Sequence, residues 1–421
     1  MPPENRDTLG QAGGAGLDAG TGMIYLGMSP WAGMWRNRHQ LMTRFARMMP
    51  VLYVEPWVRT RELRRRLASP AKILSGLVAP ASHDSAGGVT VLRSPPHRPV
   101  AHGGRLHEAT VARWVEYVLR NARGAGITRP ILWVTQPGMG SVVGKFGEIL
   151  SIYHIVDEYS GYTGQDLLRR TNIQQTEQAL LDKVDLSIVV SRELYEAKHG
   201  ESRKVFVVPN AVDFDVFAEA SAQAAVPADL AAIPRPRIGY SGLIGARLNL
   251  DLVAAAAEAR PDFHYVFVGS VDSRECSHQL MRLQNRSNVH FLGEKPAARV
   301  PEYVCGFDVG MLPYNINLET CHISPLKLYE YLAAGLPVVS TNIPAAQPFS
   351  DLINFAAGSD EFTRAVDLAL DRDSEENRQK RRMTAQANTW NDRVLQIRSI
   401  IGEALRAKGF PPGEKLVKTA S

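Results

Sequence analysis

Short apolar segments alternate with helical stretches along most of the chain, and this alternation restricts the possible folds more than any other feature. Most of these segments carry no charge. They are residues 23–27, 51–55, 89–93, 131–135, 151–156, 186–190, 205–209, 238–242, 265–269, 289–293, 308–312 and 337–341. Uncharged strands that alternate with helices are typical of parallel sheets covered by helices on both faces. The pattern therefore predicts an α/β fold.

The alternation pauses at residues 217–236, which are rich in Ala and Pro and read as a linker. A chain of 421 residues is also too long for a single core, so two domains are expected. Residues 22–216 would form one doubly wound, Rossmann-like domain and residues 237–388 another, facing each other across a cleft. The amphipathic helix expected over residues 389–410 would pack back on the first domain.

The ends of the chain and its cysteines indicate a reduced, cytoplasmic protein. Residues 1–21 are polar and Gly-rich, so we read them as a disordered leader and not as a secretory signal. Residues 411–421 read as a tail. No uncharged apolar run reaches the length of about 18 residues that a spanning helix needs. The three cysteines show no metal-ligand spacing.

Residues 324–341, SPLKLYEYLAAGLPVVST, suggest a helix whose first turns bind an anion. Ser324 is a good helix N-cap, and Pro325 suits the first helical position. Lys327 and Glu330 are three residues apart and share one face. An ordinary capped helix with a surface ion pair would show the same pattern. However, a helix N-terminus attracts phosphate, and a carboxylate one turn deeper can accept hydrogen bonds from ribose hydroxyls. We therefore interpret the motif as a nucleotide site.

The same motif resembles the donor-site helix of GT-B glycosyltransferases, in particular the broad family 4 and bacterial polysaccharide glycosyltransferases. Residues 207–217 (VVPNAVDFDVF), 237–245 (RIGYSGLIG) and 267–270 (FVGS) are similar to further segments of these enzymes, in the same order. The resemblance extends over residues 22 to 410 and implies that the second domain binds a nucleoside-diphosphate sugar. The first domain would then bind the acceptor.

The resemblance assigns roles to the motif. Lys327 and the amides near Ser324 would hold the donor diphosphate, and Glu330 would hold the ribose. With a lysine and a helix N-terminus to stabilise the leaving diphosphate, no metal ion or cofactor is required. The second acidic residue of the family pattern is replaced by His322, and Glu319 lies nearby but out of register.

The phosphate loop and the base-lining strands provide further donor-binding candidates. Gly242 and Gly245 would let the backbone approach the phosphates, and Gly269 ends a strand that would line the base. Family members usually carry an arginine directly after the first glycine of this loop. Here that position is Leu243, and Arg247 would substitute for the arginine.

Asp157 is the candidate catalytic base. It follows the apolar strand 151–156, in a segment that resembles xanthan glucuronosyltransferases, in which the matching aspartate is the base. A base at this position would take the proton of an acceptor hydroxyl, and this favours inversion at the sugar carbon. If the enzyme retains configuration, Asp157 would only orient the acceptor. A helix N-cap or turn residue is the structural alternative, and His154 is expected to be packed inside the strand.

The loop after the first strand, GMSPWAGMWRNRHQ (27–40), supplies acceptor-binding candidates. Indole faces stack on sugars, and arginine binds phosphate groups. The candidates are Trp31, Trp35, Arg36, Arg38 and His39. The alternative is that these residues belong to the core of the first domain.

Residues 57–78 combine arginines with large apolar side chains. This pattern fits a helix that lies on an anionic membrane surface. A solvated helix face or a nucleic-acid contact would give the same pattern, although no aromatic RNA-binding or helix-turn-helix signature accompanies it.

Three functions remain open from the sequence. The first is a metal-independent glycosyltransferase in exopolysaccharide or cell-surface glycan synthesis. It would be associated with the inner face of the cell membrane and act on a lipid-linked or polysaccharide acceptor. The second is a soluble nucleotide-sugar epimerase of the same fold, against which the arginine-rich run argues. The third is a non-enzymatic protein that binds nucleotides or nucleic acid, and we expect no nucleic-acid partner.

Overall fold

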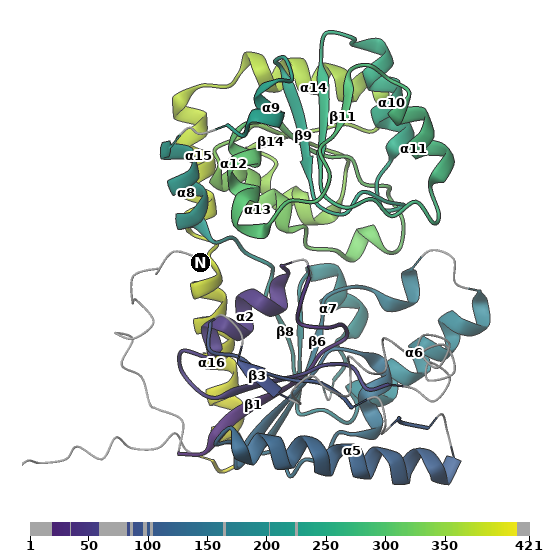
Figure 1. Cartoon of the computed structure of the whole chain (residues 1–421), viewed down its shortest axis with the longest axis vertical. Helices are drawn as coiled ribbons and strands as arrows, with labels where there is room; N and C mark the ends of the chain where they lie inside the picture. The colour runs from purple at the N-terminus through teal and green to yellow at the C-terminus, as the bar shows by residue number, and fades with distance from the viewer. Residues whose placement is uncertain are drawn as a thin grey trace, which may run out of the picture.

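The chain folds into two α/β domains, one above the other in Figure 1. The computed structural model describes residues 19–33, 35–58, 82–84, 87–95, 99–101, 104–162, 166–201, 203–223 and 226–410. Each domain is built on its own sheet, and helices lie on both sides of it. The predicted doubly wound α/β fold is confirmed.

The first domain contains an eight-stranded sheet with the order β3-β4-β2-β1-β5-β6-β7-β8. Neighbouring strands are parallel, except that β3 runs antiparallel to β4. The strands are β1 (Thr21–Leu26), β2 (Val51–Val54), β3 (Ser82–Asp84), β4 (Thr90–Leu92), β5 (Arg129–Val134), β6 (Leu150–Ile155), β7 (Leu186–Val189) and β8 (Val205–Val207). β1 and β6 are buried along their whole length, which explains why their sequences are almost free of charge.

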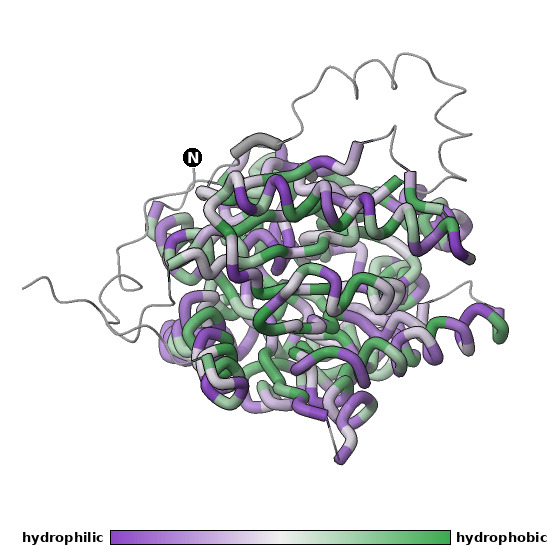
Figure 2. The backbone as a smooth tube through the Cα atoms, turned by 90° about the horizontal axis from the view of Figure 1, so that it is seen from below, coloured by the Kyte–Doolittle hydropathy of each residue, from purple (hydrophilic) through white to green (hydrophobic). Residues whose placement is uncertain are grey.

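Two layers of helices cover this sheet. They are α2 (Asn37–Phe45), α5 (Gly104–Gly124), α6 (Leu167–Leu181) and α7 (Arg192–Lys198), with the 3-10 turns η1 (Pro137–Ser141) and η2 (Tyr159–Gly161). Because side chains alternate along a strand, Met23 and Tyr25 pack in the core that contains α2, whereas Ile24 and Leu26 pack in the core that contains α5. Figure 2 shows hydrophilic and hydrophobic residues alternating along the outer helices.

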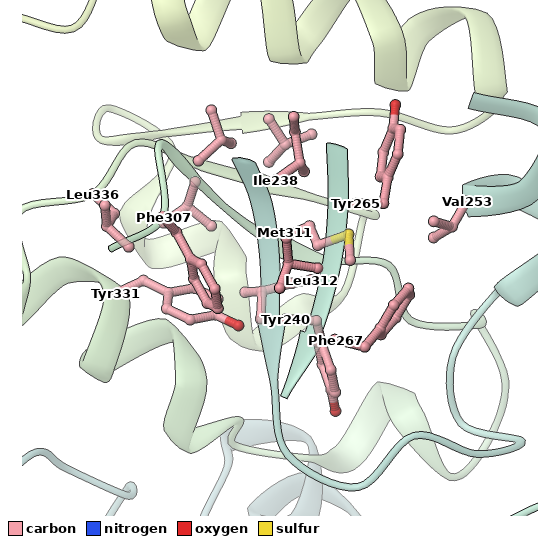
Figure 3. Packing of buried hydrophobic residues seen from close by; sticks show 14 of the residues in the cluster. Ile238, Tyr240, Val253, Tyr265, Phe267, Phe307, Met311, Leu312, Tyr331 and Leu336 are labelled. Carbon is pink, nitrogen blue, oxygen red and sulfur yellow. The ribbon is translucent and has the colours of Figure 1, made fainter. Parts of the chain in front are cut away.

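The second domain contains a six-stranded parallel sheet with the order β11-β10-β9-β12-β13-β14. Its strands are β9 (Arg237–Ser241), β10 (His264–Val268), β11 (Val289–Phe291), β12 (Val309–Leu312), β13 (Val338–Ser340) and β14 (Ile353–Phe355). Aromatic side chains fill the core around β9, as Figure 3 shows for Phe307 and Tyr331. A Cβ atom on Gly239 would lie 2.1 Å from the Phe307 ring, so this strand position requires glycine.

The remaining helices of the second domain surround this sheet. They are α10 (Leu250–Ala259), α11 (Ser277–Gln284), α12 (Val300–Cys305), α13 (Leu326–Ala333), α14 (Ser359–Asp371) and α15 (Glu375–Gln386), with the 3-10 turns η3 (Ala297–Arg299), η4 (Thr320–His322) and η5 (Pro344–Phe349). α13 carries the motif on which the nucleotide-site prediction rests.

The stretch expected to be a linker, residues 217–236, is instead largely folded. It contains most of α8 (Phe214–Gln223) and the short α9 (Ala228–Ala231). Phe217 and Leu230 are buried in the core of the second domain. The interpretation as a linker was wrong because Ala-rich sequence also forms helices, and the few large apolar side chains anchor them.

The last helix returns the chain to the first domain. α16 (Trp390–Ala407) runs down the side of that domain in Figure 1 and packs against α2. Trp390, Val394 and Ile397 are buried in the same core as Met23. A capping box starts the helix, because Asp392 N–H donates to the Thr389 hydroxyl and the Asp392 carboxylate accepts from Thr389 N–H.

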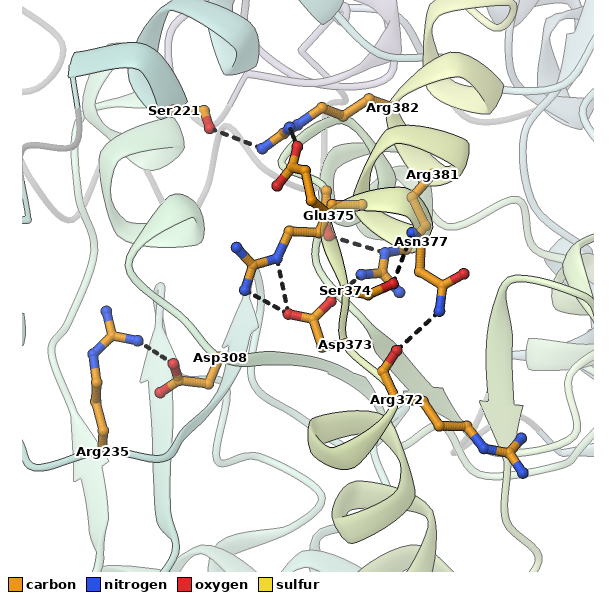
Figure 4. A network of polar contacts seen from close by, with 12 residues as sticks. Ser221, Arg235, Asp308, Arg372, Asp373, Ser374, Glu375, Asn377, Arg381 and Arg382 are labelled. Atoms are coloured by element: carbon orange, nitrogen blue, oxygen red, sulfur yellow. Dashed lines mark hydrogen bonds and ion pairs between the residues drawn. The ribbon is translucent and has the colours of Figure 1, made fainter.

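A polar network holds the end of α13 (Figure 4). Arg381 on α15 donates its Nε hydrogen to the carbonyl of Gly335, 2.9 Å away, and forms an ion pair with Asp373. Asp373 also pairs with Arg378 at 2.7 Å. Gly335 has a φ of +75°, the left-handed conformation in which helices commonly end. The helix that carries Lys327 and Glu330 is therefore fixed at its far end.

Candidate active site

The loops that leave the carboxyl ends of the two sheets meet between the domains. Asp157 follows β6 of the first sheet, and Arg247 lies in the loop after β9 of the second. Their side chains form an ion pair in which Arg247 Nη2 lies 3.2 Å from Asp157 Oδ1. Carboxyl ends of parallel strands are where ligands of such folds bind. The candidate site therefore contains residues of both domains.

Lys327 contacts the loop after β9. A Cβ atom on Gly242 would lie 2.3 Å from Lys327 Cε and 2.6 Å from Nζ, so the amine lies directly against this glycine. Gly242 has a φ of +137°, and Gly269 has a φ of +146°. A Cβ on Gly269 would lie 1.9 Å from the Gly242 carbonyl oxygen. Bare backbone therefore faces the lysine, as phosphate binding requires.

The ammonium group of Lys327 has no anionic partner among the described residues. No hydrogen bond or ion pair reaches its Nζ, which lies 5.9 Å from the centre of the Tyr240 ring. Burial lowers the pKa of Lys327; the charge of Glu330 opposes this, and the charges of Arg36 and Arg247 lower the pKa further. The ammonium group is therefore available to bind a phosphate group.

Glu330 lies one turn further along the same helix and is half-buried. Within the described residues its carboxylate accepts no hydrogen bond. Burial raises its pKa, and the charge of Lys327 opposes that shift. An unpaired carboxylate at this depth can accept hydrogen bonds from paired hydroxyl groups of a ligand.

Gly245 and Arg247 belong to a loop that pairs with the loop after β10. Ile244 accepts a hydrogen bond from Asp272 N–H at 2.8 Å, and a Cβ on Gly245 would lie 3.3 Å from the Asp272 carbonyl oxygen. This packing directs Arg247 towards the first domain. Its Nε lies 2.6 Å from Oε1 of Glu319, the acidic residue that lies out of register with the family pattern.

Asp157 is not a helix cap. The N-cap of η2 is Glu158, whose carboxylate accepts from Ser160 N–H at 3.2 Å. Asp157 instead accepts a hydrogen bond from the Tyr162 hydroxyl at 3.0 Å through Oδ2, and its Oδ1 faces Arg247. The capping alternative therefore applies to its neighbour.

A buried charge cluster that sequence reasoning missed fixes the loop carrying Asp157. Lys198 Nζ lies 2.6 Å from Glu158 and 2.7 Å from Glu177, and Tyr153 donates to Glu177. Burial lowers the pKa of Lys198, but the two carboxylates outweigh it and raise the pKa overall. Lys198 is therefore charged. Its partners are distant in the sequence, so no local signal revealed them.

His154 is packed in the strand, as expected. It is buried within β6, and its ring meets the edge of Trp133 at a centroid distance of 5.4 Å. Burial lowers the pKa of His154 to about 4, so the ring is neutral.

Three of the five acceptor-binding candidates, Trp31, Arg38 and His39, are buried inside the first domain. His39 Nδ1 accepts from Arg36 N–H at 2.9 Å, and Nε2 donates to the Trp31 carbonyl at 2.7 Å. Burial is the main cause that lowers the pKa of His39 to about 4. Arg38 donates to the Pro30 carbonyl. These side chains shape the loop and are not available to a diphosphate.

Trp35 and Arg36 remain on the surface. Trp35 is 38% exposed and stacks on the His39 ring at 4.6 Å. Burial is the main cause that lowers the pKa of Arg36. The charges of Asp157 and Arg247 also affect this pKa, so both groups lie close to Arg36. These two residues remain acceptor-binding candidates.

Ser324 is not the N-cap that we predicted. α13 begins at Leu326, with Pro325 as the N-cap residue. The Ser324 hydroxyl accepts instead from Asn210 N–H at 3.2 Å, and its carbonyl accepts from Asn210 Nδ2 at 2.6 Å. Asn210 belongs to the PNAVD segment in which the chain leaves the first domain. Ser324 therefore joins the donor helix to the segment between the domains.

The predicted membrane-binding run lies mostly outside the described residues, since only Trp57 and Val58 of residues 57–78 are described. No helix in the described parts of the chain is both long and apolar enough to cross a membrane. No group of three or more His, Cys, Asp or Glu side chains is placed to hold a metal ion, within the same residues.

Residues 235–371 match the family model described as glycosyl transferases group 1. TuaH of Bacillus subtilis, assigned to teichuronic acid biosynthesis as a glycosyltransferase, is 28% identical over 289 residues, which cover 65% of this chain and 72% of TuaH.

Two solved structures share the architecture. Sucrose-phosphate synthase from Thermosynechococcus elongatus superposes with a TM-score of 0.66 at 16% identity, covering 92% of this chain and 99% of that chain. Anabaena Alr3699/HepE, solved in complex with UDP and glucose, has a TM-score of 0.57 at 13% identity, with coverages of 91% and 99%. At sequence identities of 16% and 13%, the similarity to these two structures shows a shared fold and no more.

Proposed function

We propose that this chain, a glycosyltransferase with the GT-B fold, transfers a sugar from a nucleoside-diphosphate sugar to a growing polysaccharide or lipid-linked acceptor. One observation carries the proposal. Lys327 and Glu330 share one face of α13, neither has a hydrogen-bond partner within the described residues, and Gly242 leaves bare backbone beside Lys327. The ammonium group suits a diphosphate, and the carboxylate suits a ribose diol.

Asp157 would act as the base in this transfer. The acceptor hydroxyl gives its proton to the Asp157 carboxylate, and its oxygen forms a bond to the anomeric carbon. The bond between that carbon and the donor diphosphate breaks, and the diphosphate leaves with the electron pair. Lys327 stabilises the negative charge that develops on the leaving group. This route inverts the configuration of the sugar carbon.

The acceptor class and the place of action rest on sequence. The name of TuaH supports cell-surface glycan synthesis. The arginine-rich run 57–78 supports action at the inner face of the membrane, where a lipid-linked acceptor would be presented. The match to glycosyl transferases group 1 favours transfer over epimerisation.

A thermal-shift panel tests the donor site. UDP, GDP, ADP and their sugar conjugates are added to the wild type, to Glu330→Ala and to Glu376→Ala. Glu376 is an exposed glutamate on α15 and serves as the matched control. One nucleotide is expected to raise the melting temperature of the wild type and of the control, because a ligand that binds the native state stabilises it. Glu330→Ala should lose this shift. The absence of a shift with every nucleotide, together with salt-sensitive binding to nucleic acid, would contradict the proposal.

Transfer is also expected to continue in excess EDTA. The positive charges of Lys327 and Arg247 would perform the electrostatic role that a divalent ion has in metal-dependent transferases. The measurement is the initial rate of nucleoside-diphosphate release with and without the chelator. Loss of turnover that magnesium or manganese restores would show that a metal ion takes part.

A further inference from the structure

We propose that Arg247 exchanges one contact during the reaction, leaving Asp157 for the donor diphosphate while Glu319 holds it in place. Asp157 would then become free to act as a base only after the donor has bound. Glu319 is a positioning residue in this scheme, because it acts through Arg247. The inference rests on the proposed function.

The two ion pairs of Arg247 differ in length, in burial and in location. The pair with Glu319 joins Nε and Oε1 at 2.6 Å within the second domain, and the Glu319 side chain is 7% exposed. The pair with Asp157 joins Nη2 and Oδ1 at 3.2 Å between the domains, and the Asp157 side chain is 19% exposed. The Arg247–Asp157 pair is the longer and more exposed of the two. A ligand can therefore replace it at a lower cost in free energy.

The contact with Arg247 hinders Asp157 as a base. Both carboxylate oxygens are occupied, Oδ1 by Arg247 and Oδ2 by the Tyr162 hydroxyl at 3.0 Å. An acceptor hydroxyl needs direct access to one oxygen. Release of Arg247 would therefore open Oδ1 of Asp157 to the acceptor hydroxyl.

A diphosphate bound beside Lys327 would provide the replacement partner. Gly242 and Arg247 lie in the same loop, and Gly242 contacts the Lys327 side chain. The charge of Arg247 also affects the pKa of Lys327, so the two cations are close. Guanidinium groups bind phosphate through two parallel hydrogen bonds, which a single carboxylate oxygen at 3.2 Å does not match.

Glu319 also lies at the contact between the domains. A Cβ on Gly161 in η2 would lie 3.1 Å from the Glu319 backbone nitrogen, so the two loops touch at this point. The ion pair with Glu319 thus holds the Arg247 side chain within reach of Asp157 and close to the donor site. The scheme predicts that the donor binds before the acceptor.

Calorimetric titration tests the exchange, with the nucleoside diphosphate that gives the thermal shift (UDP, GDP or ADP) as the probe. Asp157→Asn removes the competing charge, so the probe should bind about three- to tenfold more tightly. In an Arg247→Met background the same substitution should change the affinity by less than about twofold. Glu319→Gln should weaken binding about three- to tenfold, and this loss should also vanish without Arg247. Asp182→Asn, in an exposed aspartate–arginine pair of the first domain, is the control.

The outcomes separate the two proposals. If the wild type binds no nucleoside diphosphate, the proposed function fails and the exchange fails with it. If the wild type binds the probe but Asp157→Asn does not tighten binding, the exchange alone is overturned. A gain that persists in the Arg247→Met background also overturns it. A merely structural role of Glu319 would lower the melting temperature and would give the same loss of affinity with or without Arg247.

Discussion

Asp157→Asn is expected to reduce the turnover number by about a hundred- to ten-thousandfold, the range that a general base contributes. Asparagine has nearly the same shape, so it can keep the contact with the Tyr162 hydroxyl, but it cannot take a proton. The fold and the donor site should remain intact. The measurement is the turnover number at saturating donor and acceptor, together with the dissociation constant of the nucleotide, which should not rise.

Asp182→Asn is the matched control for this prediction. Asp182 also pairs with an arginine in the first domain, Arg203, but it lies in no interdomain contact that the structure shows. Its replacement should leave turnover within about twofold of the wild type. If Asp157→Asn retains full activity, Asp157 is not the base. A transfer that retains configuration, with Asp157 only orienting the acceptor, would then be the better account.

Lys327→Ala is expected to reduce the turnover number by about a hundred- to a thousandfold, the effect of removing a group that stabilises developing charge. The donor should also bind more weakly, because the Lys327 amine is the charged group that lies directly against Gly242. Burial already lowers the pKa of Lys327, and no described residue pairs with it. Its removal should therefore leave the melting temperature of the free enzyme unchanged or raise it, since an unpaired, half-buried charge is costly.

Steady-state kinetics with varied donor and a thermal scan without ligand check both parts of this prediction. Lys380→Ala, on the exposed face of α15, is the control and should change neither quantity. Unchanged kinetics in Lys327→Ala would remove the phosphate-binding role. A large fall in melting temperature would instead show that the lysine stabilises the fold.

Most strands and their grouping into two sheets could be predicted from the sequence. A strand that helices cover on both faces of the sheet carries no charge, and such runs are easy to recognise. β1 and β6 are examples. β3 and β14 were missed because their sequences, SHD and INF, contain polar or charged residues and form no continuous apolar run. The first residue of α13 was misplaced because the Ser324 hydroxyl bonds to Asn210, which is 114 positions away in the chain.

The sequence by itself determined the α/β fold and the placement of Lys327 and Glu330 on one face of a helix, since both depend on spacing along the chain. Only the tertiary structure decided that Trp31, Arg38 and His39 are buried, because burial depends on distant elements that pack over the loop. It also brought Arg247 to Asp157, which is 90 residues away in the sequence. No local pattern encodes such a contact, because its partners meet only when two separately folded sheets place their carboxyl ends against each other.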